Sequence, residues 1–236
     1  MLKAVIFDLD GVIADSHPIH EAAWKTLLAE EGLDPAKINT DFLYAGHPRR
    51  EILRHYLGEI SEPHAERLRI RKDELYQLAA VSLAPKPGIP RVLDELEAEG
   101  IVCELATSGA RGRTLETLAK FGMTQRFAAV ITGEEVRLAK PAPDIFLLAA
   151  ARIEVLPEDS LVIEDSVAGV QAALAARMRC IGFAPPERFF SLREAGAHDV
   201  IADFPLDVAG FFRQVFEQDV ILAPARGLGF VARQGE

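Results

Sequence analysis

The chain has 236 residues, which suits one domain carrying a large insertion or two modest domains. Hydrophobic residues make up 49% and charged residues 26%, so the chain can bury a core and is not disordered. The net charge of −10 argues against nucleic acid or an anionic membrane as partner. No apolar run approaches the roughly 18 residues that cross a membrane, and the N-terminus lacks the basic region of a signal peptide. We therefore expect a cytoplasmic protein whose two cysteines, Cys103 and Cys180, are buried free thiols.

Short apolar runs recur along the chain and are typical of strands buried on both faces of a parallel sheet. Helical patterns separate the later runs. This alternation predicts an α/β fold whose core is a doubly wound, Rossmann-like parallel sheet. The predicted strands are 3–7, 101–106, 128–131, 160–163, 179–183 and 199–202, and the predicted core helices are 88–98, 110–121, 143–153 and 166–176.

Residues 16–84 interrupt this alternation, since they contain helical patterns and no convincing strand. A helical block inserted after the first strand is expected to form a cap over the carboxyl ends of the sheet, where open α/β sheets bind ligands. The linkers Asp15–Ser16 and Pro85–Gly88 would form a two-stranded hinge. The expected divisions are a catalytic core of 1–15 and 85–218, a cap of 16–84 with helices 18–31, 50–57 and 64–80, and a tail of 219–236 without assigned function.

The segment Phe7-Asp8-Leu9-Asp10-Gly11 ends the first predicted strand. Two carboxylates at positions i and i+2 leave a strand in the same direction, because side chains alternate with period two. Their repulsion is offset by a divalent cation, and carboxylate, carbonyl and water ligands suit Mg²⁺. A solvated turn is the ordinary alternative, because Asp and Gly are common turn residues.

Two further polar segments follow predicted strands. Thr107-Ser108-Gly109 lies between a strand and a helix, where hydroxyl groups and free helix N–H groups can bind phosphate, or where a hydroxyl can simply cap the helix. Lys140 is followed by Pro141 and Pro143 just before a helix, and can present a fixed ammonium to phosphate, or be an ordinary surface lysine.

Glu164 and Asp165 follow another apolar run, and one or the other would supply the remaining acidic metal ligand. An acidic helix start favoured by the helix dipole is the alternative. The four segments carry more weight together, because a parallel sheet brings all strand carboxyl ends into one crevice. That crevice would bind Mg²⁺ and phosphate beside a carboxylate poised to attack.

In their order along the chain, Asp8-x-Asp10, Thr107, Lys140 and Glu164-Asp165 resemble the four motifs of the haloacid dehalogenase-like superfamily. The resemblance extends from residue 3 to about 203, and the helical block is similar to the cap of its phosphatase and beta-phosphoglucomutase branch.

This resemblance implies a role for each motif. Asp8 would attack phosphorus, and Asp10 would act as general acid and then as general base. Thr107 and Lys140 would neutralise phosphate oxygens. The implied Mg²⁺ ligands are Asp8, the main-chain carbonyl of Asp10, and Asp165, with Glu164 nearby. Asp10 also argues against dehalogenase or phosphonatase chemistry, since the members with those activities lack this second aspartate.

Within the cap, the resemblance to beta-phosphoglucomutase implies substrate contacts for His20, Gly46, Arg49 and Lys72. Each has an ordinary alternative: His20 as a polar residue of a first helical turn, Arg49 as a solvated charge, and Lys72 as a side chain that snorkels beside an apolar stripe. Ser108 and Gly109 would complete the substrate site in the core.

Ala110 and Arg111 depart from the mutase pattern, which has a polar and basic run that grips a second phosphate. Ala110 has no polar group to bind that phosphate, although Arg111 could bind it instead. We therefore expect a phosphatase acting on a small phosphorylated metabolite, with a sugar phosphate as one option. A beta-phosphoglucomutase-like isomerase and a non-catalytic protein of the same fold are the alternatives. The expected cofactor is Mg²⁺, and the expected state is a monomer or weak homodimer without nucleic-acid or membrane partners.

Overall fold

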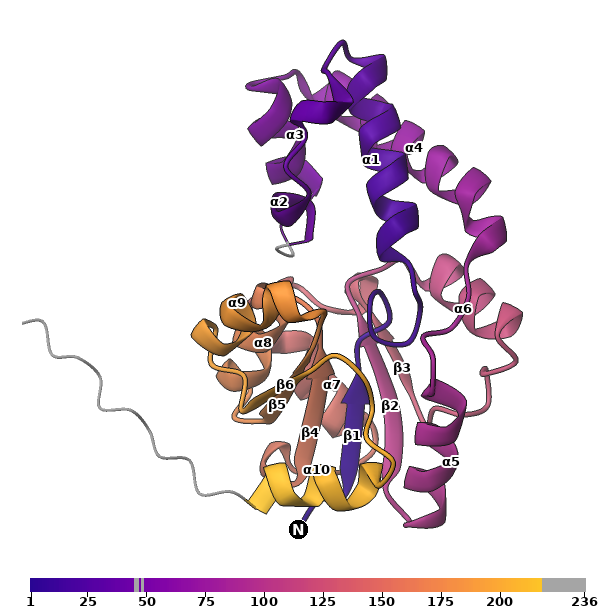
Figure 1. The fold of residues 1–236 in the computed structure, drawn as a ribbon, viewed down its shortest axis with the longest axis vertical. Helices are drawn as coiled ribbons and strands as arrows, with labels where there is room; N and C mark the ends of the chain where they lie inside the picture. Colours follow the sequence, from indigo (N-terminus) through magenta and orange to yellow (C-terminus); the bar gives the residue numbers. More distant parts are fainter. Residues whose placement is uncertain (45–46, 48, 218–236) are drawn as a thin grey trace, which may run out of the picture.

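The computed structural model describes residues 1–44, 47 and 49–217. Within them, six strands form a single sheet in the order β3-β2-β1-β4-β5-β6, and each neighbouring pair is parallel (Figure 1). The α/β class with a doubly wound parallel sheet is thus confirmed. The strands are β1 Ala4–Phe7, β2 Val102–Thr107, β3 Val130–Thr132, β4 Ser160–Glu164, β5 Arg179–Phe183 and β6 Asp199–Ile201.

The strand order reverses at β1, which pairs with β2 on one side and with β4 on the other. Chain connections therefore run outward in both directions from the centre of the sheet. This reversal opens a crevice beyond the carboxyl ends of the central strands, where sheets of this type bind ligands.

Side chains alternate between the two faces of the sheet, as the period of a strand requires. Val5 and Phe7 belong to one buried cluster, whereas Ile6 between them belongs to the other. The first cluster lies under α5 (Ile89–Ala98) and α10 (Val208–Glu217), and the second lies under α7 (Asp144–Arg152), α8 (Val167–Ala175) and α9 (Phe189–Glu194).

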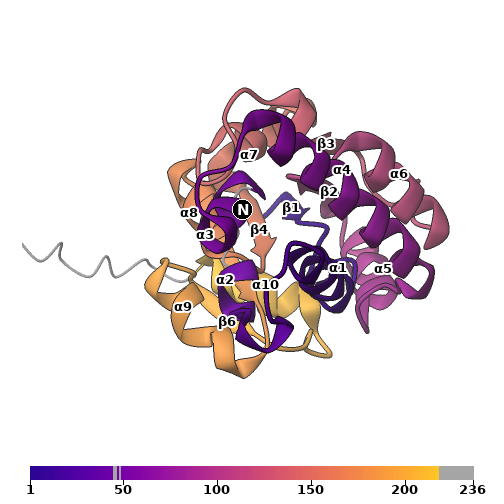
Figure 2. The ribbon, with the colours of Figure 1, turned by 90° about the horizontal axis from the view of Figure 1, so that it is seen from above.

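A helical insert, residues 16–84, separates β1 from α5. Figures 1 and 2 show its helices gathered beyond the carboxyl ends of the strands. The insert has a buried cluster of its own around Trp24, Leu27 and Leu68. The division into a core and a separate cap stays a prediction. The helices are α1 His17–Glu30, α2 Thr40–Tyr44, α3 Arg49–Leu57 and α4 Glu62–Ala79, and α6 of the core is Arg111–Lys120.

The two linkers that join the insert to the rest of the chain lie side by side. The backbone N–H of Asp15 donates to the carbonyl of Ala84 at 2.9 Å, and that of Lys86 donates to Ile13 at 2.8 Å. The Lys86 ammonium also lies 2.7 Å from the Asp15 carboxylate. The insert thus leaves and re-enters at one place.

The sequence analysis did not predict α2, α9 or α10, and no strand or helix that it predicted in the described residues is missing. The tail 219–236 lies outside the described residues. Among the described helices, none has the length and apolarity to cross a membrane.

Glu104 in β2 is a buried acid within the sheet. It pairs in register with Ile6, has no exposed surface, and its carboxyl oxygens have no hydrogen-bond partner among the described residues. Burial raises the pKa of Glu104 from 4.5 to about 8, and the more distant charge of Arg152 opposes this rise only in part. The folded protein therefore binds the Glu104 proton more tightly than the unfolded chain does.

We predict that Glu104→Gln makes stability less sensitive to pH. The contribution of a raised pKa is complete below the unfolded value of 4.5 and is lost as the pH rises through about 8. Relative to the variant, the wild type should lose at least about 1 kcal/mol of unfolding free energy between pH 5.5 and 8.5. Urea unfolding at the two pH values measures this difference. Glu116→Gln at the exposed surface of α6 is the control, and equal pH dependence in wild type and both variants would contradict the prediction.

Candidate active site

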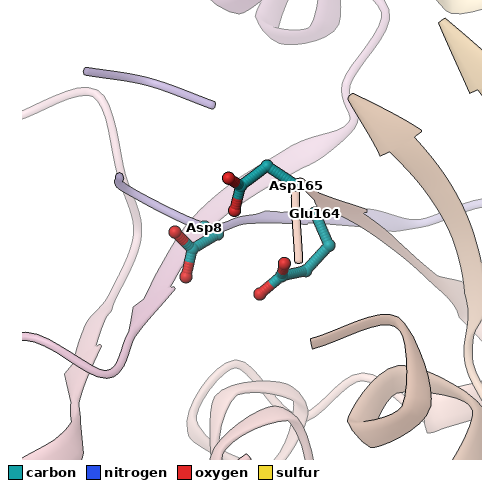
Figure 3. A group of neighbouring side chains, drawn as sticks. All are labelled: Asp8, Glu164 and Asp165. Carbon is teal, nitrogen blue, oxygen red and sulfur yellow. The ribbon is translucent and has the colours of Figure 1, made fainter. Parts of the chain in front are cut away.

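The carboxyl ends of the three central strands deliver the polar motifs to one place. Asp8 directly follows β1, Thr107 is the last residue of β2, and Glu164 is the last residue of β4, followed by Asp165. Because these strands are adjacent and parallel, their ends lie together. Asp8, Glu164 and Asp165 form a group of neighbouring carboxylates (Figure 3).

This carboxylate cluster is buried and strongly acidic. One oxygen from each of Asp8, Glu164 and Asp165 lies within 4.8 Å of the other two, and the three residues are at most 6% exposed. Burial raises the pKa of Asp8 well above its ordinary value, and the charges of Glu164 and Asp165 add to the rise. Lys140 opposes it. Burial and like charges together therefore disfavour the ionised form of Asp8 in the absence of a metal ion.

Lys140 supplies the cation that holds two of these carboxylates together. Its ammonium donates to Asp8 Oδ1 at 2.6 Å, to Glu164 Oε1 at 2.5 Å and to the carbonyl of Ala106 at 3.3 Å. Burial alone would lower the pKa of Lys140, but Asp8 and Glu164 outweigh it and raise the pKa above the ordinary value. Lys140 is therefore a fixed charge.

Glu164 is oriented by the start of α8. Its Oε2 accepts hydrogen bonds from the Ser166 N–H at 2.8 Å and from the Ser166 hydroxyl at 2.9 Å. A side chain at Gly169 would overlap the Glu164 carboxyl group, so glycine leaves room for it against the helix. Glu164 thus accepts hydrogen bonds both from Ser166, the N-cap residue of α8, and from Lys140.

Thr107, Ser108 and Gly109 form the loop between β2 and α6. Thr107 is buried, and its Oγ1 accepts from the N–H of Gly109 at 3.1 Å, whereas Ser108 is exposed. All three residues line the cavity described below. A side chain at Gly109 would collide with the guanidinium of Arg113, so glycine lets that arginine pass over the loop.

Asp10 points to a different set of partners from Asp8. Arg113 donates to both of its oxygens, at 3.1 and 2.8 Å, and His20 Nε2 lies 3.5 Å from Oδ1. Burial would raise the pKa of Asp10, but Arg113 and His20 outweigh it and hold the pKa well below its ordinary value. The Arg113 guanidinium also lies 5.1 Å from the ring centre of Tyr76 in α4. In this arrangement Asp10 is an anion that contacts Arg113 from the core and His20 from the insert.

Sequence reasoning missed Arg113, although its position one turn into a helix that follows Thr107 was a usable signal. Arginine at that place reaches back toward the carboxyl edge of the sheet.

A buried chain of polar side chains leads from the insert to Asp10. The Lys72 ammonium lies 2.7 Å from His20 Nδ1, and it sits over the rings of Trp24 and Tyr76 at 5.5 and 5.1 Å. Burial lowers the pKa of His20 to about 4 and that of Lys72 to about 7. His20 is consequently neutral near pH 7, accepting from Lys72 and facing Asp10 with its other nitrogen. Lys72 is 1% exposed, so it is not a solvated surface charge.

A cavity of about 780 Å³ lies between the insert and the carboxyl edge of the sheet. Arg49 lines it and lies 2.8 Å from the Asp73 carboxylate, at 39% side-chain exposure. Gly46 lies outside the described residues. The other predicted site residues that line the cavity are Asp8, Asp10, His20, Lys72, Thr107, Ser108, Gly109, Lys140 and Asp165, while Glu164 is not among them.

Two residues that the sequence analysis did not single out contact Asp165. His17 Nε2 lies 2.6 Å from Asp165 Oδ2. Arg188 Nη2 donates to the Asp165 carbonyl at 2.8 Å, and its Nη1 lies 3.7 Å from Oδ2. Both residues come from distant parts of the sequence, so no local pattern indicated these contacts.

The donor set fits a hard divalent cation. Asp8, Glu164 and Asp165 offer carboxylate oxygens close enough to share one ion, and oxygen ligands are those that Mg²⁺ prefers. Burial and repulsion from Glu164 and Asp165 raise the pKa of Asp8, although Lys140 opposes the rise. A bound cation would relieve that repulsion.

The chain is similar in sequence and fold to proteins of one known family. Residues 5–183 match the family model described as haloacid dehalogenase-like hydrolase. The chain is 36% identical over 190 residues to a beta-phosphoglucomutase of Bacillus subtilis, covering 77% of this chain and 83% of that protein. It is 32% identical over 181 residues to a fructose-1-phosphate phosphatase of Escherichia coli, covering 75% and 94%. A solved beta-phosphoglucomutase of Clostridium difficile superposes with a TM-score of 0.75 at 27% identity, covering 92% and 97%.

We predict that Lys140→Met destabilises the metal-free protein by about 3 kcal/mol, because removing one partner leaves buried carboxylates without compensation. Urea unfolding measures the loss. The control is Lys3→Met, which removes a 2.6 Å pair with Asp159 from a lysine that is 56% exposed. That pair should be worth at most about 1 kcal/mol. Equal losses in the two variants would show that Lys140 does not hold the site together.

Proposed function

The chain is an enzyme that belongs to the haloacid dehalogenase-like hydrolase family, and we propose that it hydrolyses the phosphate ester of a small carbohydrate through an aspartyl-phosphate at Asp8. The observation that carries the proposal is the placement of Asp8, which adjoins an acidic cluster and Lys140 at the floor of a cavity roofed by the insert. The named activities of relatives support a carbohydrate substrate, because they include a fructose-1-phosphate phosphatase and a hexitol phosphatase.

In the first step, a carboxylate oxygen of Asp8 attacks phosphorus and the bond from phosphorus to the ester oxygen breaks. Lys140 holds Asp8 Oδ1 at 2.6 Å and thereby fixes the direction of the nucleophile. Thr107, at the end of the neighbouring strand, offers its hydroxyl to a phosphate oxygen. Mg²⁺, held by Asp8, Asp165 and the carbonyl of Asp10 with Glu164 nearby, would offset the charge of the carboxylates and the phosphoryl group.

Asp10 would donate a proton to the leaving alcohol oxygen and then take one from the water that cleaves the aspartyl-phosphate. Inorganic phosphate and the free alcohol are released, and Asp8 and Asp10 return to their starting states. Both Asp10 oxygens accept from Arg113 in this structure and the pKa of Asp10 is held well below its ordinary value, so Asp10 has to leave that ion pair and take up a proton from solvent before it can donate. A movement of Arg113 relative to Asp10 is therefore part of the proposed cycle.

Hydrolysis is favoured over isomerisation by the position of Arg111. Its guanidinium lies 3.3 Å from both the Val130 carbonyl and the Glu135 carboxylate, and Arg111 does not line the described cavity. Ala110 lines the cavity but has no polar group. Positions 110 and 111 of the loop after β2 thus offer no polar side chain in the cavity to bind the second phosphate that a mutase must hold. The competing mutase activity is favoured by the 36% identical relative of that name.

The decisive assay compares the two activities on one protein sample. Phosphate release from a panel of phosphorylated sugars and sugar alcohols is measured with Mg²⁺, beside isomerisation of beta-glucose 1-phosphate. The proposal expects phosphate release from at least one panel member to exceed isomerisation. Efficient isomerisation with little phosphate release would assign the chain to the mutases.

We predict that Asp8→Asn lowers turnover by at least about a thousandfold and abolishes the phosphoenzyme, because an amide cannot act as the nucleophile. Acid-quenched protein analysed by mass spectrometry shows the phosphorylated intermediate. Circular dichroism checks that the variant is folded, and Asp94→Asn at a 69% exposed side chain is the control. Near wild-type turnover in folded Asp8→Asn would refute the mechanism.

The helical insert is proposed to act as a cap that closes over Asp8 and excludes water until the substrate is bound. The paired linkers are the natural hinge, since they join the insert to the core at one place. Arg49 at the cavity wall would then contact the distal part of the substrate rather than the transferred phosphate. Its charge also adds to burial in lowering the pKa of Lys72, so the two cations lie close enough to interact.

We predict that Arg49→Ala raises KM for the natural substrate at least about tenfold and changes turnover of para-nitrophenyl phosphate by less than about twofold. Removing a remote contact weakens binding and leaves the chemistry at Asp8 intact. The neighbouring Arg50→Ala is a matched control, because Arg50 is 79% exposed and pairs with Glu62. Equal loss on both substrates would show that Arg49 supports the structure instead.

A further inference from the structure

The contact between His17 and Asp165 joins the helical insert directly to the acidic cluster. His17 is the first residue of α1, and its Nε2 lies 2.6 Å from Asp165 Oδ2. The side chains are 21% and 8% exposed, so the contact is largely shielded from water. This separation is that of a hydrogen bond, in which a ring N–H is the donor and the carboxylate oxygen the acceptor.

The backbone beside this contact leaves no space for a larger residue. A Cβ at Gly11 would lie 2.5 Å from Asp165 Oδ2 and 2.6 Å from His17 Nε2. Gly11 also has a φ of +83°, which residues with side chains rarely adopt. The turn after Asp10 thus brings its main chain against both partners and fixes where they meet.

Asp165 is held from a second direction by the core. Arg188 donates to its main-chain carbonyl at 2.8 Å and places a second nitrogen 3.7 Å from Oδ2. Arg188 therefore secures the backbone of Asp165, whereas His17 makes the shorter contact to its carboxylate. The contact with His17 thus fixes the orientation of the carboxylate that also belongs to the acidic cluster.

We propose that His17 is a positioning residue that orients the Asp165 carboxylate for the divalent cation and so links the metal site to the insert. The inference rests on the metal site of the proposed function and adds to it a residue outside the four motifs. Hydrogen-bond partners of metal ligands fix the orientation of those ligands, and their loss typically weakens metal affinity by about 10- to 100-fold.

A link of this kind adds a direct contact between the insert and the acidic cluster to the other contacts between insert and core, such as those of Lys120 with Ala80 and Val81. His17 lies two residues after Asp15 in the first linker, and α1 packs along α4 over most of its length. A movement of α1 relative to the core therefore has to break or lengthen the contact between His17 and Asp165, or else move the Asp165 side chain with it. Metal affinity and insert position are consequently coupled through one side chain.

The test is Mg²⁺ affinity, measured on the full chain by isothermal titration calorimetry without substrate at a single pH of 8. His17→Ala should weaken Mg²⁺ binding by about 10- to 100-fold. His17→Gln keeps an N–H donor at the end of the side chain and should stay within about threefold of the wild type. His64→Ala, which removes the 2.9 Å contact to Glu31 at the far side of the insert, is the matched control and should bind Mg²⁺ normally.

A second measurement separates positioning from a merely structural role. The kcat of His17→Ala on para-nitrophenyl phosphate should approach the wild-type value once Mg²⁺ is saturating, while the Mg²⁺ concentration for half-maximal rate rises. If His17→Ala does not fold, His17→Asn, whose shorter amide cannot reach Oδ2 in the same way, carries the same expectation.

Two results would overturn the inference. Equal Mg²⁺ affinity in wild type and folded His17→Ala would remove His17 from the metal site while leaving the proposed function intact. No Mg²⁺ binding by the wild type, seen as no heat of binding, would refute the proposed metal site and the inference with it.

Discussion

The structure depends on the burial of several negative charges at the carboxyl ends of neighbouring parallel strands. Such an arrangement is costly unless fixed cations lie within contact distance. Lys140 meets this need by donating to Asp8 and Glu164, and it comes from the loop before α7. The same cluster lines a cavity, with Asp8 and Lys140 among the residues that face it. The ion pairs that hold the folded site and the groups that a bound molecule would meet therefore belong to one cluster.

The two aspartates of the first motif differ because their neighbours differ. Asp8 lies among carboxylates and one ammonium, whereas Asp10 is flanked by Arg113 and His20. Opposite shifts in pKa follow, upward for Asp8 in the absence of metal and downward for Asp10. Residues of the same type, two positions apart, thus differ in proton affinity because of contacts from α6 and from the insert. A general acid needs a bound proton, so the role proposed for Asp10 requires that its contact with Arg113 be released first.

Much of this arrangement could be predicted from the sequence, because buried parallel strands and the residues at their ends leave local patterns. The run before Asp8, the break in alternation at the insert and the order of the motifs are all visible without coordinates. The contacts of Arg113 with Asp10, and of His17 and Arg188 with Asp165, are set by tertiary packing between distant segments. The buried acid Glu104 was missed for a related reason, since an apolar run interrupted by one glutamate reads as an ordinary strand. The roles of the individual residues and the separate cap remain predictions.

The paired linkers have a consequence for how such a protein can be remodelled. Hydrogen bonds join the two ends of the insert. The insert is therefore a closed loop that does not separate the core segments before and after it. The entropic cost of closing a loop grows slowly with length, by about 0.6 kcal/mol for each doubling. Inserts of very different size can therefore be accommodated at this junction with little penalty to the sheet. Recombination or design could exchange the insert as a cassette, provided that the contacts of His17 with Asp165 and of His20 with Asp10 are rebuilt.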